Sequence, residues 1–183
     1  MKGFSKRAKG ILLREFNEEH SVLSNNLRAL AIHGALTVLA LGIVITGSIV
    51  FNLIIFAFAL LAVPLVYMFL AYRLLTPLPK GNLLSVSFLP IALISLYIVG
   101  FMHYLATGVV NDDVWMFMWF LNPAFTFTAL GVYAYVTAEA VRSNTLIVFT
   151  LSSIAACVPS LLMYMGLRIK MWQQGKRKLN WRN

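Results

Sequence analysis

Charged residues are scarce in this chain and make up 11% of its 183 residues, against roughly 25% in ordinary soluble domains. Between residues 29 and 166 the full charges fall in three short clusters, which hold Arg73, Lys80, Asp112, Asp113, Glu139 and Arg142. The clusters leave uncharged apolar runs of roughly 20 residues or more, about the length of a helix that crosses a ~30 Å hydrocarbon core. This pattern excludes an ordinary soluble domain and predicts a polytopic membrane protein.

Cysteine is nearly absent, and no catalytic or cofactor signature stands in its place. Cys157 is the only cysteine and lies in an apolar run, which excludes a disulfide framework and a cysteine-based metal site. Asp112 and Asp113 are neighbours on a predicted loop, where adjacent side chains usually point in different directions, so they do not form a general acid–base pair. His33 and His103 are expected near opposite ends of their spans, which disfavours a haem held by two histidines. We therefore expect no enzymatic activity, no metal and no cofactor.

The long apolar runs predict an all-α integral membrane bundle of four to five transmembrane helices. The block at 29–72 is too long for one helix, and Gly47, Ser48 and Asn52 are its only plausible turn. The predicted bundle covers residues 29–167, with spans at about 29–46, 51–72, 83–105, 114–136 and 145–167. The first apolar run is too long for a signal peptide, so we expect it to be retained.

The segment at residues 1–28 is charged but has the pattern of an amphipathic helix. Leu12 and Phe16 share one face of such a helix, while Arg14 opposes them. The helix is expected either to lie in the membrane interface or to pack on the bundle as a cytosolic stub. Polar residues at 24–26 predict a bend before the first span.

Basic residues predict the orientation of the chain. Twelve of the fifteen Lys and Arg lie in the two tails, six in residues 1–28 and six in the basic tail at 168–183. Since Lys and Arg near helix ends mark the cytoplasmic side, both termini are expected in the cytoplasm, with Asp112 and Asp113 outside. Five complete crossings would place the tails on opposite sides. Either one tail disobeys the charge rule, or the stretch at 114–136 is re-entrant or lies at the outer face.

The stretch LNPAFTF resembles the Asn-Pro-Ala box of aquaporins, although the resemblance covers these residues alone and that family carries two boxes. Asn122 and Pro123 can open a helix and expose its backbone to a ligand. The alternative is a proline kink whose polar groups are satisfied by neighbouring helices. The candidate ligand or partner site therefore consists of Asn122, Pro123, Thr126, His103 and Trp119.

Small residues repeat every four positions along the last predicted span. Ser152, Ala156 and Ser160 are expected to form a close-packed helix seam, either inside the bundle or against another subunit.

The whole pattern favours a non-enzymatic subunit or accessory component of a membrane transport or secretion assembly. The alternatives are a small stand-alone transporter or channel-like protein, and a membrane immunity protein against a secreted peptide or toxin. We expect the bacterial cytoplasmic membrane as the location. Expected partners are the lipid bilayer, with anionic lipid bound through the basic tails, and other membrane subunits or a second copy of the chain. No nucleic acid is expected.

Overall fold

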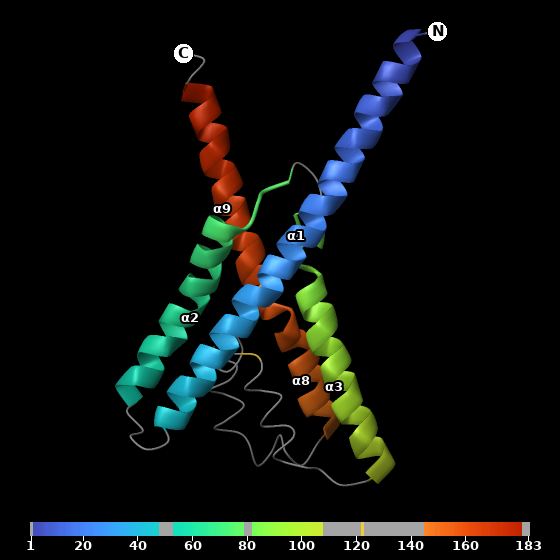
Figure 1. Ribbon diagram of the computed structural model, residues 1–183. Coiled ribbons are helices and arrows are strands. Elements are labelled where there is room, and N and C mark those ends of the chain that lie inside the picture. The colour runs from blue at the N-terminus through green and yellow to red at the C-terminus, as the bar shows by residue number, and fades with distance from the viewer. Residues whose placement is uncertain (1, 48–52, 79–81, 108–121, 123–144, 181–183) are drawn as a thin grey trace.

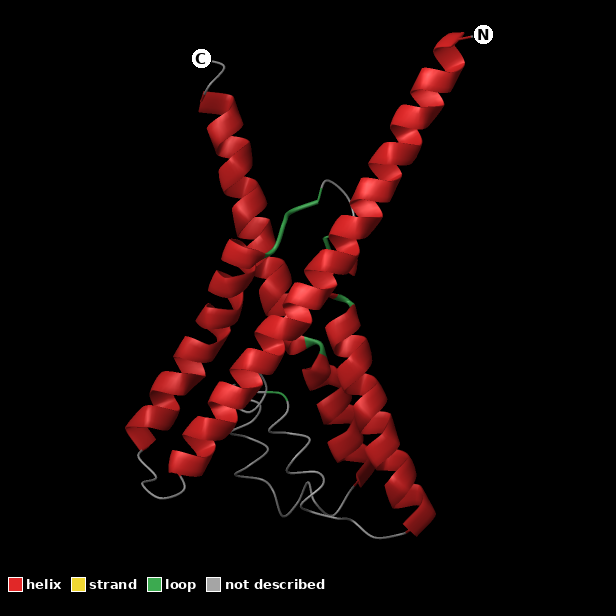
Figure 2. Ribbon diagram, in the orientation of Figure 1, coloured by secondary structure: helices red, strands yellow, loops and turns green. Residues whose placement is uncertain are grey.

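The computed structural model describes residues 2–47, 53–78, 82–107, 122 and 145–180. Its elements are α1 (Lys2–Gly47), α2 (Leu53–Leu74), a 3-10 turn η1 (Leu84–Val86), α3 (Phe88–Thr107), α8 (Thr145–Ala156) and α9 (Val158–Asn180). Figure 2 shows helices and no strand in the part of the chain that is described. The prediction of an all-α fold is confirmed for these residues.

Among the described residues, two helical stretches are long and apolar enough to cross a membrane. They cover Phe88–Thr107 in α3 and Ser152–Gly175, which runs from the end of α8 into α9, with mean hydropathies of 1.9 and 1.4. A shorter apolar helical stretch covers Ala62–Leu74. These segments support association with a membrane, because a crossing needs about 20 predominantly apolar residues. The predicted stretch at 114–136 lies outside the described residues, apart from Asn122.

Helix α1 is continuous over 46 residues, which corresponds to about 69 Å at a rise of 1.5 Å per residue. The bend predicted at residues 24–26 is wrong, because the helix passes through them without interruption. Asn25 and Asn26 bind the connection between α2 and α3. Asn26 Nδ2 also donates to the Val22 carbonyl one turn earlier in α1, at 3.1 Å. The amides are therefore satisfied without a break in the helix.

The helices run alternately up and down and cross near the middle of the molecule (Figure 1). Lys2 and Asn180 both lie at the upper end of this view. Thr107, where α3 ends, and Thr145, where α8 begins, both lie towards the lower end. The outer parts of α1 and α9 extend beyond the other helices at the upper end, as two diverging arms.

The core lies where α1, α2, α3 and α9 converge. Its largest fully buried apolar side chains include Tyr67, Tyr97, Leu75, Leu89, Met163 and Leu167. Helices α2 and α9 approach closely at Gly166, where an added Cβ would overlap the carbonyl oxygen of Met68 and lie 3.1 Å from the Cβ of Ala71. A glycine at this contact lets the two backbones meet.

The last predicted span, at 145–167, is broken. Helix α8 ends at Ala156 and α9 begins at Val158, with a tightened turn in which the Cys157 N–H donates to the Ile154 carbonyl at 3.1 Å. Pro159 explains the break, because proline has no N–H to offer the carbonyl four residues earlier and its ring crowds that carbonyl. In this chain the carbonyl deprived of its helical partner belongs to Ala155.

Candidate functional site

Asn122, the residue that the sequence singled out, is fully buried against the broken helix. Its Nδ2 donates a hydrogen bond of 2.9 Å to the Ala155 carbonyl. That carbonyl is the one that Pro159 cannot satisfy. Asn122 also hydrogen-bonds with the buried side chain of Tyr97 on α3. Among the described residues, Asn122 therefore joins α3 to the kink between α8 and α9. The kink considered at Pro123 itself lies outside the described residues.

The other residues of the predicted ligand site do not gather around Asn122. Pro123, Thr126 and Trp119 lie outside the described residues. His103 is exposed near the end of α3, and its carbonyl accepts a hydrogen bond of 2.9 Å from the Thr107 hydroxyl. An exposed histidine on α3 is not part of the buried cluster that holds Asn122.

The small-residue stripe on the last two helices faces the interior of the chain. Ser152, Ala156 and Ser160 are 1%, 0% and 6% exposed. The Ser160 hydroxyl donates to the Val86 carbonyl of η1 at 2.8 Å. These contacts place the stripe against protein rather than lipid, and they tie α9 to the start of α3.

A layer of polar contacts, which the sequence did not reveal, holds the connection between α2 and α3. Asn25 of α1 makes two bonds to one residue: its Nδ2 donates to the Thr76 carbonyl at 2.7 Å, and its Oδ1 accepts from the Thr76 N–H at 2.9 Å. Asn26 binds the next segment, donating to the Leu84 carbonyl at 2.7 Å and accepting from the Phe88 N–H at 3.0 Å. Because Phe88 begins α3, Asn26 supplies an acceptor for a donor in that helix's first turn.

Within the same connection, Asn82 closes a small loop. Its Oδ1 accepts from the Leu78 N–H at 2.8 Å, and its Nδ2 donates to the Leu78 carbonyl at 2.9 Å. The amide also contacts the Met171 sulfur of α9 at 2.7 Å. The connection is thus fastened to α1 on one side and to α9 on the other.

Two cations cap the carboxyl end of α2. The Arg28 guanidinium donates to the Leu74 carbonyl at 2.9 Å, and the Lys170 ammonium donates to the Leu75 carbonyl at 2.7 Å. The last carbonyls of a helix have no intrahelical partner and carry a partial negative charge. Cations from α1 and α9 therefore stabilise the end of α2 and bring three helices together at one level.

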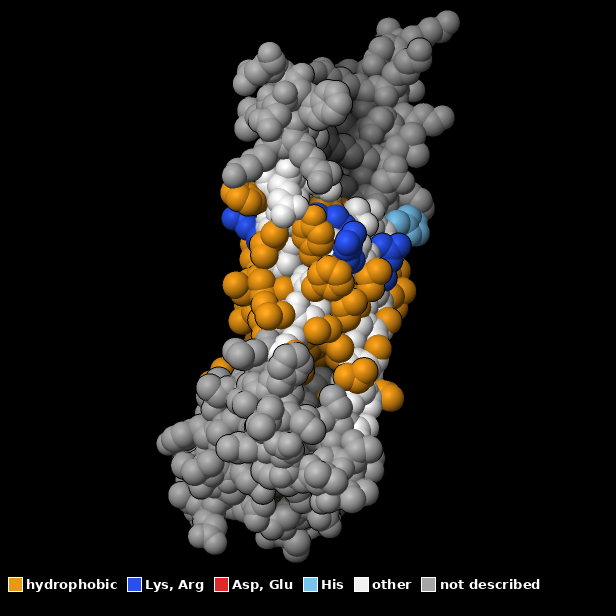
Figure 3. Space-filling model, turned by 90° about the vertical axis from the view of Figure 1, so that its left-hand side faces the viewer, with side chains coloured by type: hydrophobic (Ala, Val, Ile, Leu, Met, Phe, Trp, Pro, Cys, Tyr) orange, Lys and Arg blue, Asp and Glu red, His pale blue; other side chains and the backbone are white. Residues whose placement is uncertain are grey.

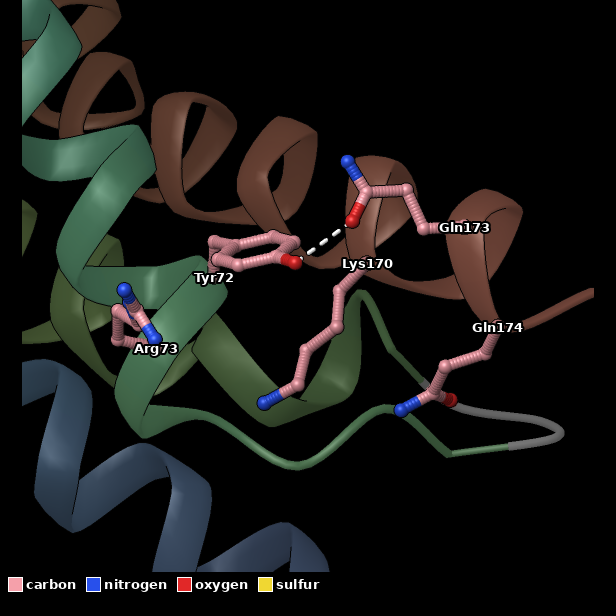
Figure 4. A pocket seen from close by; sticks show the side chains of 5 residues that line it. All are labelled: Tyr72, Arg73, Lys170, Gln173 and Gln174. Carbon is pink, nitrogen blue, oxygen red and sulfur yellow. Dashed lines mark hydrogen bonds between the residues drawn. The ribbon is translucent and has the colours of Figure 1, made fainter. Parts of the chain in front are cut away.

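Beside this cap, an open pocket of about 220 Å³ lies between α2 and α9 (Figure 4). Its lining is polar and basic, and consists of Tyr72, Arg73, Lys170, Gln173 and Gln174. The Tyr72 hydroxyl donates to Gln173 Oε1 at 2.6 Å, and the Arg73 guanidinium stands 5.5 Å from the centre of the Phe69 ring. No carboxylate lines the pocket.

Figure 3 shows how this end of the molecule relates to its apolar surface. Hydrophobic side chains form a belt around the middle, and Lys and Arg gather at the edge of the belt nearest the two termini. Where side chains are described, the Lys and Arg residues are Arg28, Arg73, Arg168 and Lys170, and none of the described side chains is Asp or Glu. Among the side chains that the structure describes, the edge of the belt therefore carries positive charge only.

Inside the bundle, the described polar side chains of α1 and α2 are paired. His33 and Tyr67 are buried, and the His33 Nδ1 lies 2.8 Å from the Tyr67 hydroxyl. No group of three or more His, Cys, Asp or Glu that could hold a metal ion occurs among the described residues. No protein-family model, curated protein or solved structure matches the chain.

Proposed function

We propose that this chain is a non-enzymatic, multi-pass membrane protein that acts as an anchoring or accessory subunit of a larger membrane assembly. It crosses the membrane four times, with both termini in the cytoplasm, and presents the outer parts of α1 and α9 to its partner. The observation that carries the proposal is the projection of these two helices from the same end of the bundle, beyond its basic edge (Figure 1).

The number of crossings is supported by the direction of each helix. Helices α1, α2 and α3 run in alternate directions, and α8 with α9 returns the chain to the end where α1 begins. Since α3 ends and α8 begins at the same end of the molecule, the stretch at 114–136 is proposed to be re-entrant or to lie at the outer face. Four crossings remove the conflict between hydropathy and the distribution of basic residues.

The orientation is supported by the charged edge of the bundle. Arg28, Arg73, Arg168 and Lys170 lie at the end nearer both termini. Further Lys and Arg follow in the arms, at Lys2, Lys6, Arg7, Lys9, Arg14, Lys176, Arg177, Lys178 and Arg182. Positive charge beside helix ends marks the cytoplasmic side.

The internal contacts favour a subunit over a stand-alone transporter. A transporter built around a broken helix leaves backbone groups available to its substrate. Here the Asn122 amide donates to the Ala155 carbonyl, which Pro159 leaves without a helical donor, and the Ser160 hydroxyl donates to the Val86 carbonyl. These groups serve the packing of the chain, which leaves the arms and the basic edge as the surfaces for interaction.

Co-purification tests the proposal. The full chain, carrying an affinity tag in its native membrane, is extracted in mild detergent and compared with chains lacking residues 2–14 or 176–183. We expect the full chain to co-elute with a defined membrane complex, and each truncated chain to reach the membrane in normal amount but lose the complex. A monodisperse full chain that supports solute flux in proteoliposomes without a partner would establish the transporter alternative instead.

A further inference from the structure

The pocket between α2 and α9 has the chemistry of an anion site at the surface of a membrane. Arg73 and Lys170 supply positive charge, and Gln173 and Gln174 supply amide donors. In Figure 4, Lys170 and Gln174 extend from α9 with their nitrogen atoms towards the same side, while Arg73 lies on the α2 side. Guanidinium and ammonium groups are the usual protein donors to phosphate oxygens.

The capping contacts at the end of α2 leave this charge available. Lys170 uses one donor on the Leu75 carbonyl, and an ammonium group has three donors. Arg28 acts on Lys170 with a charge of the same sign. No described side chain is an Asp or Glu that could neutralise these cations. Among the described side chains, an anion in the pocket would therefore meet only positive charge at the edge of the apolar belt (Figure 3).

Two exposed apolar ridges lead from the pocket into that belt. On α2, Phe69 and Leu65 lie one and two turns before Arg73 and are 55% and 63% exposed. On α9, Ile169 and Met165 lie one and two turns before Gln173 and are 41% and 51% exposed. Residues four apart lie on the same helix face. A phosphate bound at the pocket would thus sit above apolar surface that suits acyl chains.

From these observations we propose that the pocket lined by Tyr72, Arg73, Lys170, Gln173 and Gln174 binds the phosphate headgroup of an anionic phospholipid, whose acyl chains lie on the apolar surface of α2 and α9. This site is distinct from the basic tails, because it is built by the bundle itself. It rests on the proposed membrane placement of the chain. It would fix a lipid at the junction of the two helices and so orient the arm formed by α9.

The test uses the full chain, purified in a mild non-ionic detergent and titrated with phosphatidylglycerol or phosphatidylcholine. We expect preference for phosphatidylglycerol, and an Arg73→Gln variant should lose about fivefold in affinity for it, the factor that corresponds to about 1 kcal/mol per basic residue near the surface. Arg168→Gln is the matched control, since Arg168 is an exposed cation on α9 that does not line the pocket. Its affinity should stay within twofold of the unchanged protein.

Further measurements distinguish binding at this pocket from other causes of a preference for anionic lipid. Gln174→Ala should weaken binding in the same direction as Arg73→Gln, and deletion of residues 176–183 should leave the preference for phosphatidylglycerol in place. Circular dichroism confirms that each variant keeps its helix content. Equal losses in the Arg73 and Arg168 variants would mean diffuse attraction and overturn the site. Loss of the preference for phosphatidylglycerol on deletion of residues 176–183 would also overturn it. A chain that fails to insert into vesicles at all would refute the proposed function, whereas one that inserts without lipid preference would refute only this site.

Discussion

Gly166→Ala probes a close contact between the backbones of α2 and α9. An added Cβ at this position would overlap the Met68 carbonyl oxygen and crowd Ala71. The overlap is with backbone, which cannot turn away as the end of a flexible side chain can. Overpacking of this kind typically costs about 1–3 kcal/mol, because α2 and α9 must move apart along their contact.

The matched control is Gly34→Ala, because a Cβ at Gly34 on α1 meets nothing within 4 Å. Both changes gain about 1 kcal/mol of helix propensity, which cancels when the two variants are compared. Gly166→Ala should therefore be less stable than Gly34→Ala by about 1–3 kcal/mol. Reversible unfolding in mixed micelles of mild detergent and dodecyl sulfate, followed by circular dichroism, measures the difference. Equal stabilities would show that α2 and α9 do not meet at Gly166, and would refute the packing described for the core.

Three further changes test individual contacts in the same assay. Asn122→Leu should lower the free energy of unfolding by about 1–3 kcal/mol and lower membrane abundance with it. Adding Pro159→Ala should recover part of the loss, since alanine restores the N–H that the Ala155 carbonyl lacks. A double variant no more stable than Asn122→Leu alone would contradict this. Asn25→Ala should cost about 1–3 kcal/mol because both backbone groups of Thr76 lose their partner, and an unchanged unfolding curve would show that the clamp adds nothing. Ala156→Leu should cost about 1–3 kcal/mol by overpacking a fully buried position; a protein as stable as before would place Ala156 on an open surface.

The helices could be predicted from the sequence because apolar composition and period are local properties. The pattern of small residues at Ser152, Ala156 and Ser160 indicated a buried stripe for the same reason, and all three are buried. Such features depend on residues within a few turns of one another.

Most of the polar contacts could not be predicted, because they join segments far apart in the chain. Asn25 and Thr76 are 51 residues apart, and Asn26 binds a carbonyl 58 residues away. In the sequence, two adjacent asparagines favour a helix end. Only their hydrogen-bond partners in the connection between α2 and α3 show that they hold α1 against that connection. Asn122 was singled out from the sequence as a ligand-site candidate, yet its partner Ala155 lies 33 residues away, and that contact favours a structural role over ligand binding.

The central proposal is that the chain crosses the membrane four times with both termini in the cytoplasm, and site-directed cysteine labelling tests it most directly. Single-cysteine variants with Cys157→Ala as background carry Lys2→Cys, Thr107→Cys or Asn183→Cys, and are exposed in intact cells to a thiol reagent that cannot enter. We predict modification at position 107, where α3 ends, and modification at positions 2 and 183 only after the cells are permeabilised. Ready modification at position 183 with protection at position 2 would establish five crossings and contradict the account.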